Sequence, residues 1–307
     1  MSAMSWLITG GCGFIGSHLA DTVVAGGDRV RILDDLSSGE IENAPPGAEL
    51  IRGDVADAAV VEGAMDGVAG CFHLAAIASV ERCNEDWIGA HRVNVGGLIN
   101  VLSAARRRAT PVVYASSAAV YGASRELPLG EKSPTSPLSP YAVDKLSCEL
   151  QARIAGRIFG VPSAGLRLFN VYGARQDPTS PYAGVISIFL ERLLRDEALA
   201  IHGDGKQTRD FIHVADVVRA FKAAMRIVDL SGGVYNVCTG RAASLLDLAA
   251  ALGKAAGRPA RFVWEPPRKG DVAASVGDPT LLFERTGLSA KVSLEAGLAN
   301  LISQLRQ

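Results

Sequence analysis

Short apolar runs alternate with longer stretches of helical periodicity through the first half of the chain. The runs are rich in Val, Ile and Leu, as strands buried on both faces are. Strands that alternate with helices predict a parallel sheet with helices on both sides, a doubly wound Rossmann α/β fold. We expect the strands of this sheet at 6–9, 29–33, 49–52, 70–74, 111–115, 163–169 and 234–237, and one long helix at 90–107.

The pattern changes after residue 171, where a loop rich in Gly, Pro and Ser interrupts the alternation. Helical periodicity returns beyond it, and the last strand of the main sheet follows the second of the later helices. We therefore expect a Rossmann domain and a smaller C-terminal α/β domain. The expected helices are 185–195, 214–228 and 244–256, and the expected domains are 1–171 plus 210–237 and 172–209 plus 238–307.

A glycine-rich turn, Gly10 to Gly16, joins the first strand to the first helix. Glycines there permit positive φ and let backbone N–H groups approach a pyrophosphate at the helix N-terminus. Asp34 follows the second strand, where a carboxylate suits the ribose hydroxyls of NAD and would repel the extra phosphate of NADP. The sequence therefore predicts an NAD site.

Tyr141 and Lys145 are four residues apart, so they share one face of a helix that Ser139 would cap and Pro140 would begin. A phenol is a poor base at neutral pH, but a nearby ammonium favours the phenolate. The pair is therefore a candidate general base or acid. Ser117 follows the fifth strand, at the sheet edge where such folds bind ligands.

Composition narrows the class of protein. The net charge of −1 and the pI of about 6.5 give no electrostatic case for nucleic acid or an anionic membrane. We see no apolar run long enough for a membrane span and no signal peptide in residues 1–9. The five cysteines form neither C-x-x-C nor a metal spacing with His, so we expect reduced core residues of a cytoplasmic protein without a metal.

The whole chain resembles the extended short-chain dehydrogenase/reductase family. The motifs that carry this likeness are TGGCGFIGSHL at 9–19, HLAA at 73–76, YASSAAVYG at 114–122 and SPYAVDK at 139–145. Within the family the chain is most similar to the UDP-galactose and UDP-N-acetylglucosamine 4-epimerases. The second half supports this through RLFNVYGARQDPTSPYAGVIS at 167–187, GDGKQTRDFIHV at 203–214 and RKGD at 268–271.

The resemblance implies a mechanism, a set of contacts and a UDP-sugar-binding, substrate-binding role for the smaller C-terminal domain. Tyr141 would take the proton of the sugar 4-hydroxyl, Lys145 would hold the nicotinamide ribose and Ser117 would bond the same sugar oxygen. A 4-keto sugar would turn over and be reduced on its other face. A homodimer would form through helices near 90–107 and 141–158. The implied cofactor contacts are Gly10, Gly13, Phe14, Ile15, Gly16, Asp34, Asp35, Asp54, Val55, Leu74, Ala75, Ala76, Asn94, Tyr141 and Lys145. The implied UDP-hexose contacts are Ser117, Asn170, Val185, Ala200, His202, Arg209, Arg268, Asp271 and Ser275.

Two positions bear on the sugar. Ser275 is the seventh residue after Arg268, where a Tyr accompanies glucose/galactose enzymes and a small residue admits an N-acetyl group. Asp177 is the seventh residue after Asn170, where glucuronate epimerases carry an Arg. We therefore expect interconversion of UDP-N-acetylglucosamine and UDP-N-acetylgalactosamine as well as UDP-glucose and UDP-galactose, and poor use of UDP-glucuronate.

Alternatives remain at this point. Nucleotide-sugar dehydratases and decarboxylases share the fold, the cofactor and the Tyr-Lys pair. Related dehydratases place acids directly after the active-site Ser or Thr, whereas Ala118 and Ala119 follow Ser117. Many relatives have Thr at the position of Ala119, and some galactose enzymes have Lys at the position of Ala78. A redox-sensing NAD binder is the third possibility, and an intact Ser117, Tyr141 and Lys145 argue against it.

Overall fold

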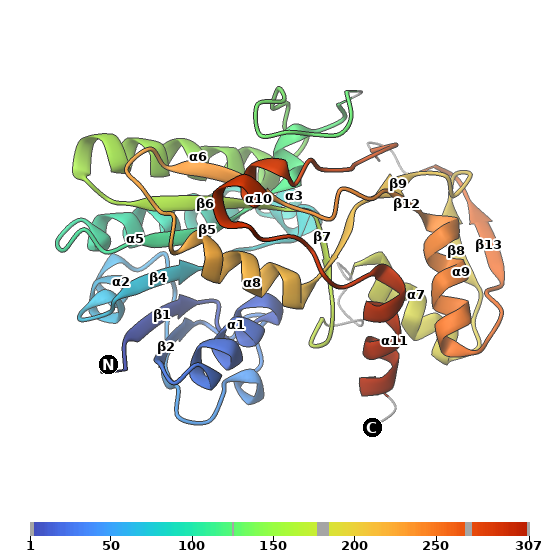
Figure 1. Ribbon diagram of the computed structural model, residues 1–307, viewed down its shortest axis with the longest axis horizontal. Helices are drawn as coiled ribbons and strands as arrows, with labels where there is room; N and C mark the ends of the chain where they lie inside the picture. The colour runs from blue at the N-terminus through green and yellow to red at the C-terminus, as the bar shows by residue number, and fades with distance from the viewer. Residues whose placement is uncertain (1–2, 125, 177–183, 268–271, 306–307) are drawn as a thin grey trace.

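The computed structural model describes residues 3–124, 126–176, 184–267 and 272–305. All seven expected strands lie in one parallel sheet, in the order β11-β6-β5-β4-β1-β2-β3. The expected Rossmann fold is confirmed (Figure 1). The strands are β1 (Ser5–Thr9), β2 (Arg29–Asp34), β3 (Glu49–Arg52), β4 (Gly70–His73), β5 (Val112–Ser117), β6 (Ser163–Leu168) and β11 (Gly233–Val237).

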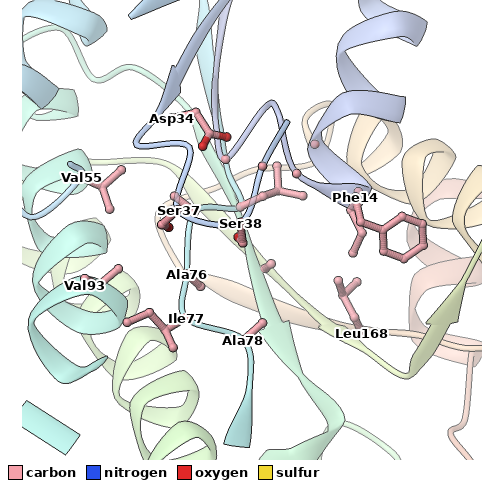
Figure 2. A pocket seen from close by; sticks show the side chains of 18 of the residues that line it. Phe14, Asp34, Ser37, Ser38, Val55, Ala76, Ile77, Ala78, Val93 and Leu168 are labelled. Carbon is pink, nitrogen blue, oxygen red and sulfur yellow. The ribbon is translucent and has the colours of Figure 1, made fainter. Parts of the chain in front are cut away.

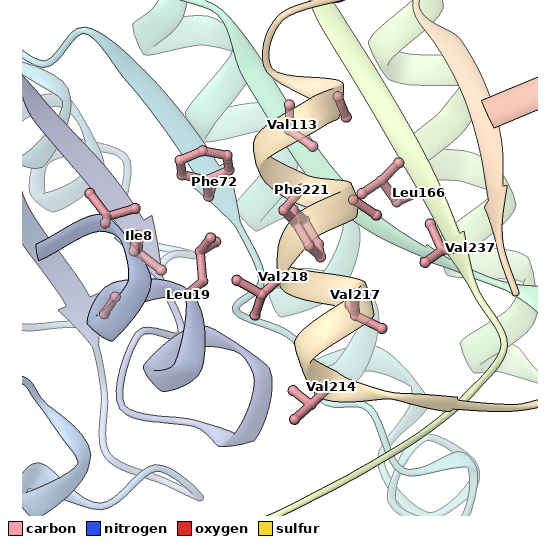
Figure 3. Close-up of a cluster of buried hydrophobic side chains, with 14 of the residues drawn as sticks. Ile8, Leu19, Phe72, Val113, Leu166, Val214, Val217, Val218, Phe221 and Val237 are labelled. Carbon is pink, nitrogen blue, oxygen red and sulfur yellow. The ribbon is translucent and has the colours of Figure 1, made fainter. Parts of the chain in front are cut away.

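Helices cover both faces of this sheet, because strands β1, β2, β4 and β5 place apolar side chains in a core on each side. Helices α1 (Phe14–Ala25) and α8 (Val214–Ala224) cover one face, where Phe221 and Val218 of α8 pack beside Leu19 of α1 (Figure 3). Helices α2 (Ala58–Met65), α5 (Gly97–Ala105) and α6 (Pro140–Phe159) enclose a second apolar core on the other face.

The long helix expected at 90–107 consists of three segments. Helix α4 (Trp87–His91) leads into a π-helical turn, η2 (Arg92–Gly96), which continues as α5. The wider turn contains Asn94. Such π-turns occur frequently at functional sites, because one extra residue re-aims the side chains of that turn.

A smaller lobe lies beside the sheet (Figure 1). Its core joins Phe189, Leu248 and Leu298 from three helices. Leu282 of a fourth helix, α10 (Thr280–Thr286), instead packs into the core of the main sheet. The lobe contains α7 (Val185–Leu194), β8 (Leu199–His202), β9 (Thr208–Arg209), β12 (Ala243–Ser244), α9 (Leu245–Ala256), β13 (Phe262–Glu265) and α11 (Leu294–Leu305).

Short elements link the two lobes. Strand β7 (Asn170–Tyr172) pairs with β10 (Phe211–His213) where the chain leaves and re-enters the main sheet. The proposed domain division follows these crossings and remains a prediction. The remaining elements are η1 (Ile41–Asn43), α3 (Val80–Glu85), η3 (Ala118–Tyr121) and α10 (Thr280–Thr286). Over the described residues, every helix is too short or too polar to cross a membrane.

Candidate active site

A cavity of about 520 Å³ opens at the carboxyl ends of β1, β2, β4 and β5 (Figure 2). This is the edge at which doubly wound sheets bind ligands. Residues from the glycine turn, from the ends of the strands and from the start of α6 meet there. The sequence-predicted residues that line it are Gly10, Gly13, Phe14, Ile15, Gly16, Asp34, Asp35, Val55, Leu74, Ala75, Ala76, Ser117, Tyr141 and Lys145.

The glycine turn fits tightly against the next strand connection. Gly10 has φ +68°, and a Cβ there would lie 2.7 Å from the backbone nitrogen of Ala75. A Cβ on Gly16 would collide with the carbonyl oxygen of Gly10. Helix α1 begins directly after Gly13, which gives it no side-chain cap. Its first backbone N–H groups therefore face the cavity as donors for a phosphate.

Asp34 presents a buried carboxylate to the same cavity. One oxygen accepts from the amide of Cys12 at 2.9 Å and the other from the amide of Leu36 at 2.9 Å. Each carboxylate oxygen keeps a further lone pair, so two ribose hydroxyls can still donate to it. Burial, and next the charge of Asp34, raise the pKa of the Cys12 thiol to about 11, so this cysteine stays neutral.

The wall beyond Asp34 is apolar and suits an adenine ring. Val55, Ile77 and Val93 lie on that side of the cavity (Figure 2). Asp54 and Asn94 do not line it. The Asp54 carboxylate accepts from Arg92 at 2.8 Å and from the amide of Ala56 at 2.8 Å.

Asn94 lies behind the cavity wall instead of in it. Its side-chain oxygen accepts from the amide of Ile77 at 2.8 Å, and its nitrogen donates to the carbonyl of Ile77 at 3.2 Å and to Asp144 at 3.2 Å. Asn94 therefore holds Ile77 in place and ties this wall to helix α6.

The start of α6 forms as the sequence predicts. Ser139 Oγ accepts from the amide of Ala142 at 3.2 Å, and Pro140 occupies the first turn. Tyr141 and Lys145 then face the cavity one turn apart. Lys145 Nζ donates to the carbonyl of Ala115 at 3.0 Å and lies 5.8 Å from the centre of the Tyr141 ring.

Ser117 completes this group of side chains. Its Oγ accepts from the amide of Ala119 at 3.1 Å, which leaves the hydroxyl proton free to donate toward the cavity. A donor, a phenol and an ammonium thus converge on one space, an arrangement suited to acid–base chemistry at a hydroxyl or carbonyl oxygen. The described residues contain no cluster of His, Cys, Asp or Glu able to hold a metal ion.

His73 lies buried behind Lys145. Its Nδ1 is 2.8 Å from Thr9 Oγ1. Burial, and to a smaller extent the charge of Lys145, lower the pKa of His73 to about 3. The imidazole is therefore neutral near pH 7 and serves as a structural hydrogen-bonding group.

The comparison with known proteins decides the family. The model of the NAD dependent epimerase/dehydratase family matches residues 6–238. This chain belongs to that family. A UDP-glucose 4-epimerase of Mycolicibacterium smegmatis is 37% identical over an alignment of 313 residue positions. The alignment covers 99% of each chain.

Solved structures of this family match over almost the whole chain. The UDP-glucose 4-epimerase of Thermotoga maritima, solved with UDP-glucose, has a TM-score of 0.94 and 36% identity, covering 99% of each chain. The UDP-glucose 4-epimerase of Thermus thermophilus, solved with NAD, has a TM-score of 0.91 and 35% identity, covering 99% of each chain.

Family members with other substrates or activities also match. A UDP-N-acetylglucosamine 4-epimerase of Methanobrevibacter ruminantium has a TM-score of 0.92 and 32% identity, covering 99% of this chain and 100% of its own. UDP-glucuronic acid decarboxylase 1 of Arabidopsis thaliana is 30% identical over 98% of this chain and 69% of its own length.

The cofactor of this family is NAD, and the residues present fit it. The uncapped start of α1 suits the pyrophosphate, Asp34 suits a ribose and the wall beside Ile77 suits the adenine. The sequence did not single out several residues that also line the cavity. The sequence signals that bear on them are the Ser-Ser-Gly turn at 37–39 and the motif at 167–187. These further residues include Ser37, Ser38, Gly39, Ile77, Arg82, Val93, Leu168, Phe169, Arg175, Gln176 and Gly184.

Of the described residues implied for the UDP-hexose, Ser117 lines this cavity and the others lie apart from it. Arg209 donates to the carbonyls of Thr208 at 2.8 Å and Val272 at 2.6 Å, which fixes it against the segment of Ser275. Arg268 and Asp271 lie outside the described residues. The described residues of this set that do not line the cavity are Asn170, Val185, Ala200, His202, Arg209 and Ser275, and their contacts with substrate remain a prediction.

Proposed function

We propose that this chain is an NAD-dependent 4-epimerase of UDP-hexoses. One observation carries the proposal: Ser117, Tyr141 and Lys145 line the same cavity as the glycine turn and Asp34. The full-length likeness to UDP-glucose 4-epimerases supports the reaction and the nucleotide.

The chain's own residues supply the proton chemistry. Ser117 donates a hydrogen bond to the oxygen on carbon-4 and orients it. Tyr141 accepts the proton of that hydroxyl and later returns it to the 4-keto oxygen. Lys145, held by the carbonyl of Ala115, keeps a positive charge beside the phenol and would bond the nicotinamide ribose. The dinucleotide supplies reversible oxidation and reduction of carbon-4, so the net reaction is an inversion.

A dehydratase or a decarboxylase is the competing function, because the family contains both kinds of enzyme. A dehydratase needs an acid beside the departing oxygen. Among the described residues, the carboxylates that line the cavity are Asp34 and Asp35, both on the ribose side. Ala118 and Ala119 follow Ser117, which favours epimerisation.

We also propose that the sugar pocket admits an N-acetyl group. Ser275 is small and half-buried, and it would leave the volume that a Tyr ring occupies in glucose/galactose enzymes. The substrates would then be UDP-N-acetylglucosamine and UDP-N-acetylgalactosamine in addition to UDP-glucose and UDP-galactose.

The proposed assembly is a homodimer through α6 and its neighbours. Val143, Leu150, Ile154 and Ile158 are exposed along one face of α6, at helical spacing. A large exposed apolar stripe of this kind marks a contact surface. The proposed location is the cytoplasm, which agrees with five buried, unpaired cysteines.

A panel of UDP-sugars tests the reaction. The purified protein would be incubated with UDP-glucose, UDP-galactose, both acetylated sugars and UDP-glucuronate, and the products followed by NMR. The proposal requires the plain and the acetylated sugars each to give their 4-epimer without release of carbon dioxide or loss of water, and UDP-glucuronate to react poorly. A 4-keto-6-deoxy product would establish a dehydratase, and a pentose product would establish a decarboxylase.

A further inference from the structure

A buried polar network begins on the catalytic helix. Glu149 lies one turn after Lys145 on α6, and its side chain is buried. One carboxylate oxygen accepts from Ser116 Oγ at 2.6 Å and from Arg167 Nε at 2.8 Å. The other accepts from Arg167 Nη2 at 2.6 Å. The ion pair therefore joins helix α6 to strand β6, and the bond from Ser116 joins it to the neighbouring strand β5.

The network continues away from α6 through Tyr121. Arg167 Nη1 donates to the Tyr121 hydroxyl oxygen at 2.9 Å, and that hydroxyl donates to Asn236 Oδ1 at 2.7 Å. Burial raises the pKa of Tyr121, so the phenol keeps the proton that it donates. Asn236 Nδ2 then donates to the carbonyls of Leu129 at 2.8 Å and Asp278 at 3.4 Å.

The far end of the network reaches the segment of Ser275. The amide of Leu129 donates to the carbonyl of Val276 at 2.9 Å, and the amide of Asp278 donates to the carbonyl of Leu129 at 2.9 Å. Val276 is the direct neighbour of Ser275. A continuous set of hydrogen bonds thus runs from the helix of Tyr141 to the segment that would border the sugar.

The end of the network at Ser116 affects the orientation of Ser117, the next residue of the strand. Successive side chains of a strand point to opposite faces, so the bond from Ser116 to Glu149 on one face fixes the direction of Ser117 on the other. Each of the five linked side chains is nearly inaccessible to water. Buried, fully bonded networks of this kind specify one arrangement, because a member that loses its partner becomes costly.

We propose that this network is a positioning device that fixes the Ser117–Tyr141 pair relative to the sugar-binding segment around Ser275, with Tyr121 as its central positioning residue. The inference rests on the proposed function. An epimerase must hold its 4-keto sugar while the ring presents its other face, and a loosened pocket would release it. A misplacement of about 1 Å can cost on the order of 100-fold in rate.

Two phenylalanine variants test this. Tyr121→Phe removes the hydroxyl that joins Arg167 to Asn236 and keeps the ring. Tyr114→Phe is the matched control, because Tyr114 is equally buried, lies on β5 and has a hydroxyl without a hydrogen-bond partner among the described residues. Ser116→Ala is a second test variant, which breaks only the link to Glu149 and serves if Tyr121→Phe does not fold.

Tyr121→Phe should lower kcat by about tenfold or more, while its NAD content stays at the wild-type value. After incubation with UDP-galactose, a growing fraction of its bound cofactor should be recovered reduced, because 4-keto sugar escapes before it is reduced again. Tyr114→Phe should behave as wild type in both respects. Equal behaviour of the two variants would overturn the inference, and so would a loss of kcat with no reduced cofactor.

Hydrogen exchange separates this inference from the proposed function. Amides of 129, 236 and 276–278 should exchange faster in Tyr121→Phe than in Tyr114→Phe, whatever substrate the enzyme uses. If wild type does not turn over UDP-hexoses and these amides still exchange faster in Tyr121→Phe, the proposed function is contradicted and the network is not. Unchanged exchange in both Tyr121→Phe and Ser116→Ala would contradict the network.

Discussion

The amide of Ser275 donates a hydrogen bond to the carbonyl oxygen of Thr208 at 3.1 Å, beside Arg209. The backbone at position 275 is therefore held in place independently of its side chain. Ser275→Tyr should fill the proposed N-acetyl space, and overlap in a packed site costs roughly 1–3 kcal/mol or more. The kcat/KM ratio of UDP-N-acetylglucosamine to UDP-glucose should fall by about tenfold or more.

Ser275→Ala is the control for this substitution and should keep both activities. Steady-state assays with the two sugars measure the ratio directly. A ratio that is the same in wild type and Ser275→Tyr would remove Ser275 from the sugar pocket.

The enzyme should purify with NAD bound, since the cofactor ends each turnover in the form in which it began. Asp34→Asn should lose most of that NAD, because the NH2 group of the amide cannot accept a hydrogen bond from a ribose hydroxyl as the second carboxylate oxygen can. Asp66→Asn, at an exposed ion pair with Arg108, should keep it. Nucleotide analysis of denatured protein is the measurement, and recovery of NADP from wild type would contradict the role given to Asp34.

The sequence predicted the sheet and the cofactor cavity well because both depend on local signals. Apolar runs and the Gly10–Gly16 turn specify neighbouring backbone, and the strands bring their carboxyl ends together. The role of Asn94 could not be predicted in this way, because its bonds to Ile77 and Asp144 join distant segments across a π-turn. Strand β13 is exposed along its length, so it shows no alternation to detect.

Charged residues illustrate the same limit. Glu149 and Arg167 stand on α6 and β6, and nothing in the separate segments indicates that they pair. An Arg in the otherwise apolar run of β6 was a usable signal that a buried partner exists.

UDP-glucuronate should be a poor substrate. The position at which glucuronate epimerases carry an Arg is Asp177, which lies outside the described residues. Two carboxylates about 4 Å apart repel by roughly 1 to 4 kcal/mol, depending on the local dielectric. Asp177→Arg should therefore raise kcat/KM for UDP-glucuronate, while turnover of UDP-glucuronate comparable with that of UDP-glucose in wild type would argue against this assignment.

Stability should fall below about pH 6.5 because of His73. Its folded pKa of about 3 lies below the unfolded value, so the unfolded chain binds the proton first. The contribution is complete above the unfolded pKa and is lost as pH falls toward the folded pKa. Between pH 7 and pH 5, urea unfolding should show wild type losing about 2 kcal/mol more than His73→Gln. Parallel losses in the two proteins would show that His73 carries its charge in the folded state.

Tyr141→Phe tests the central claim most directly, by the rate at which UDP-galactose becomes UDP-glucose. The ring and the fold are kept, and only the group that exchanges the proton is removed. General acid–base groups contribute about 10² to 10⁴ in rate. We predict a folded protein that still binds NAD and epimerises at less than about a hundredth of the wild-type rate. A variant that retains more than about a tenth of that rate would contradict the mechanism.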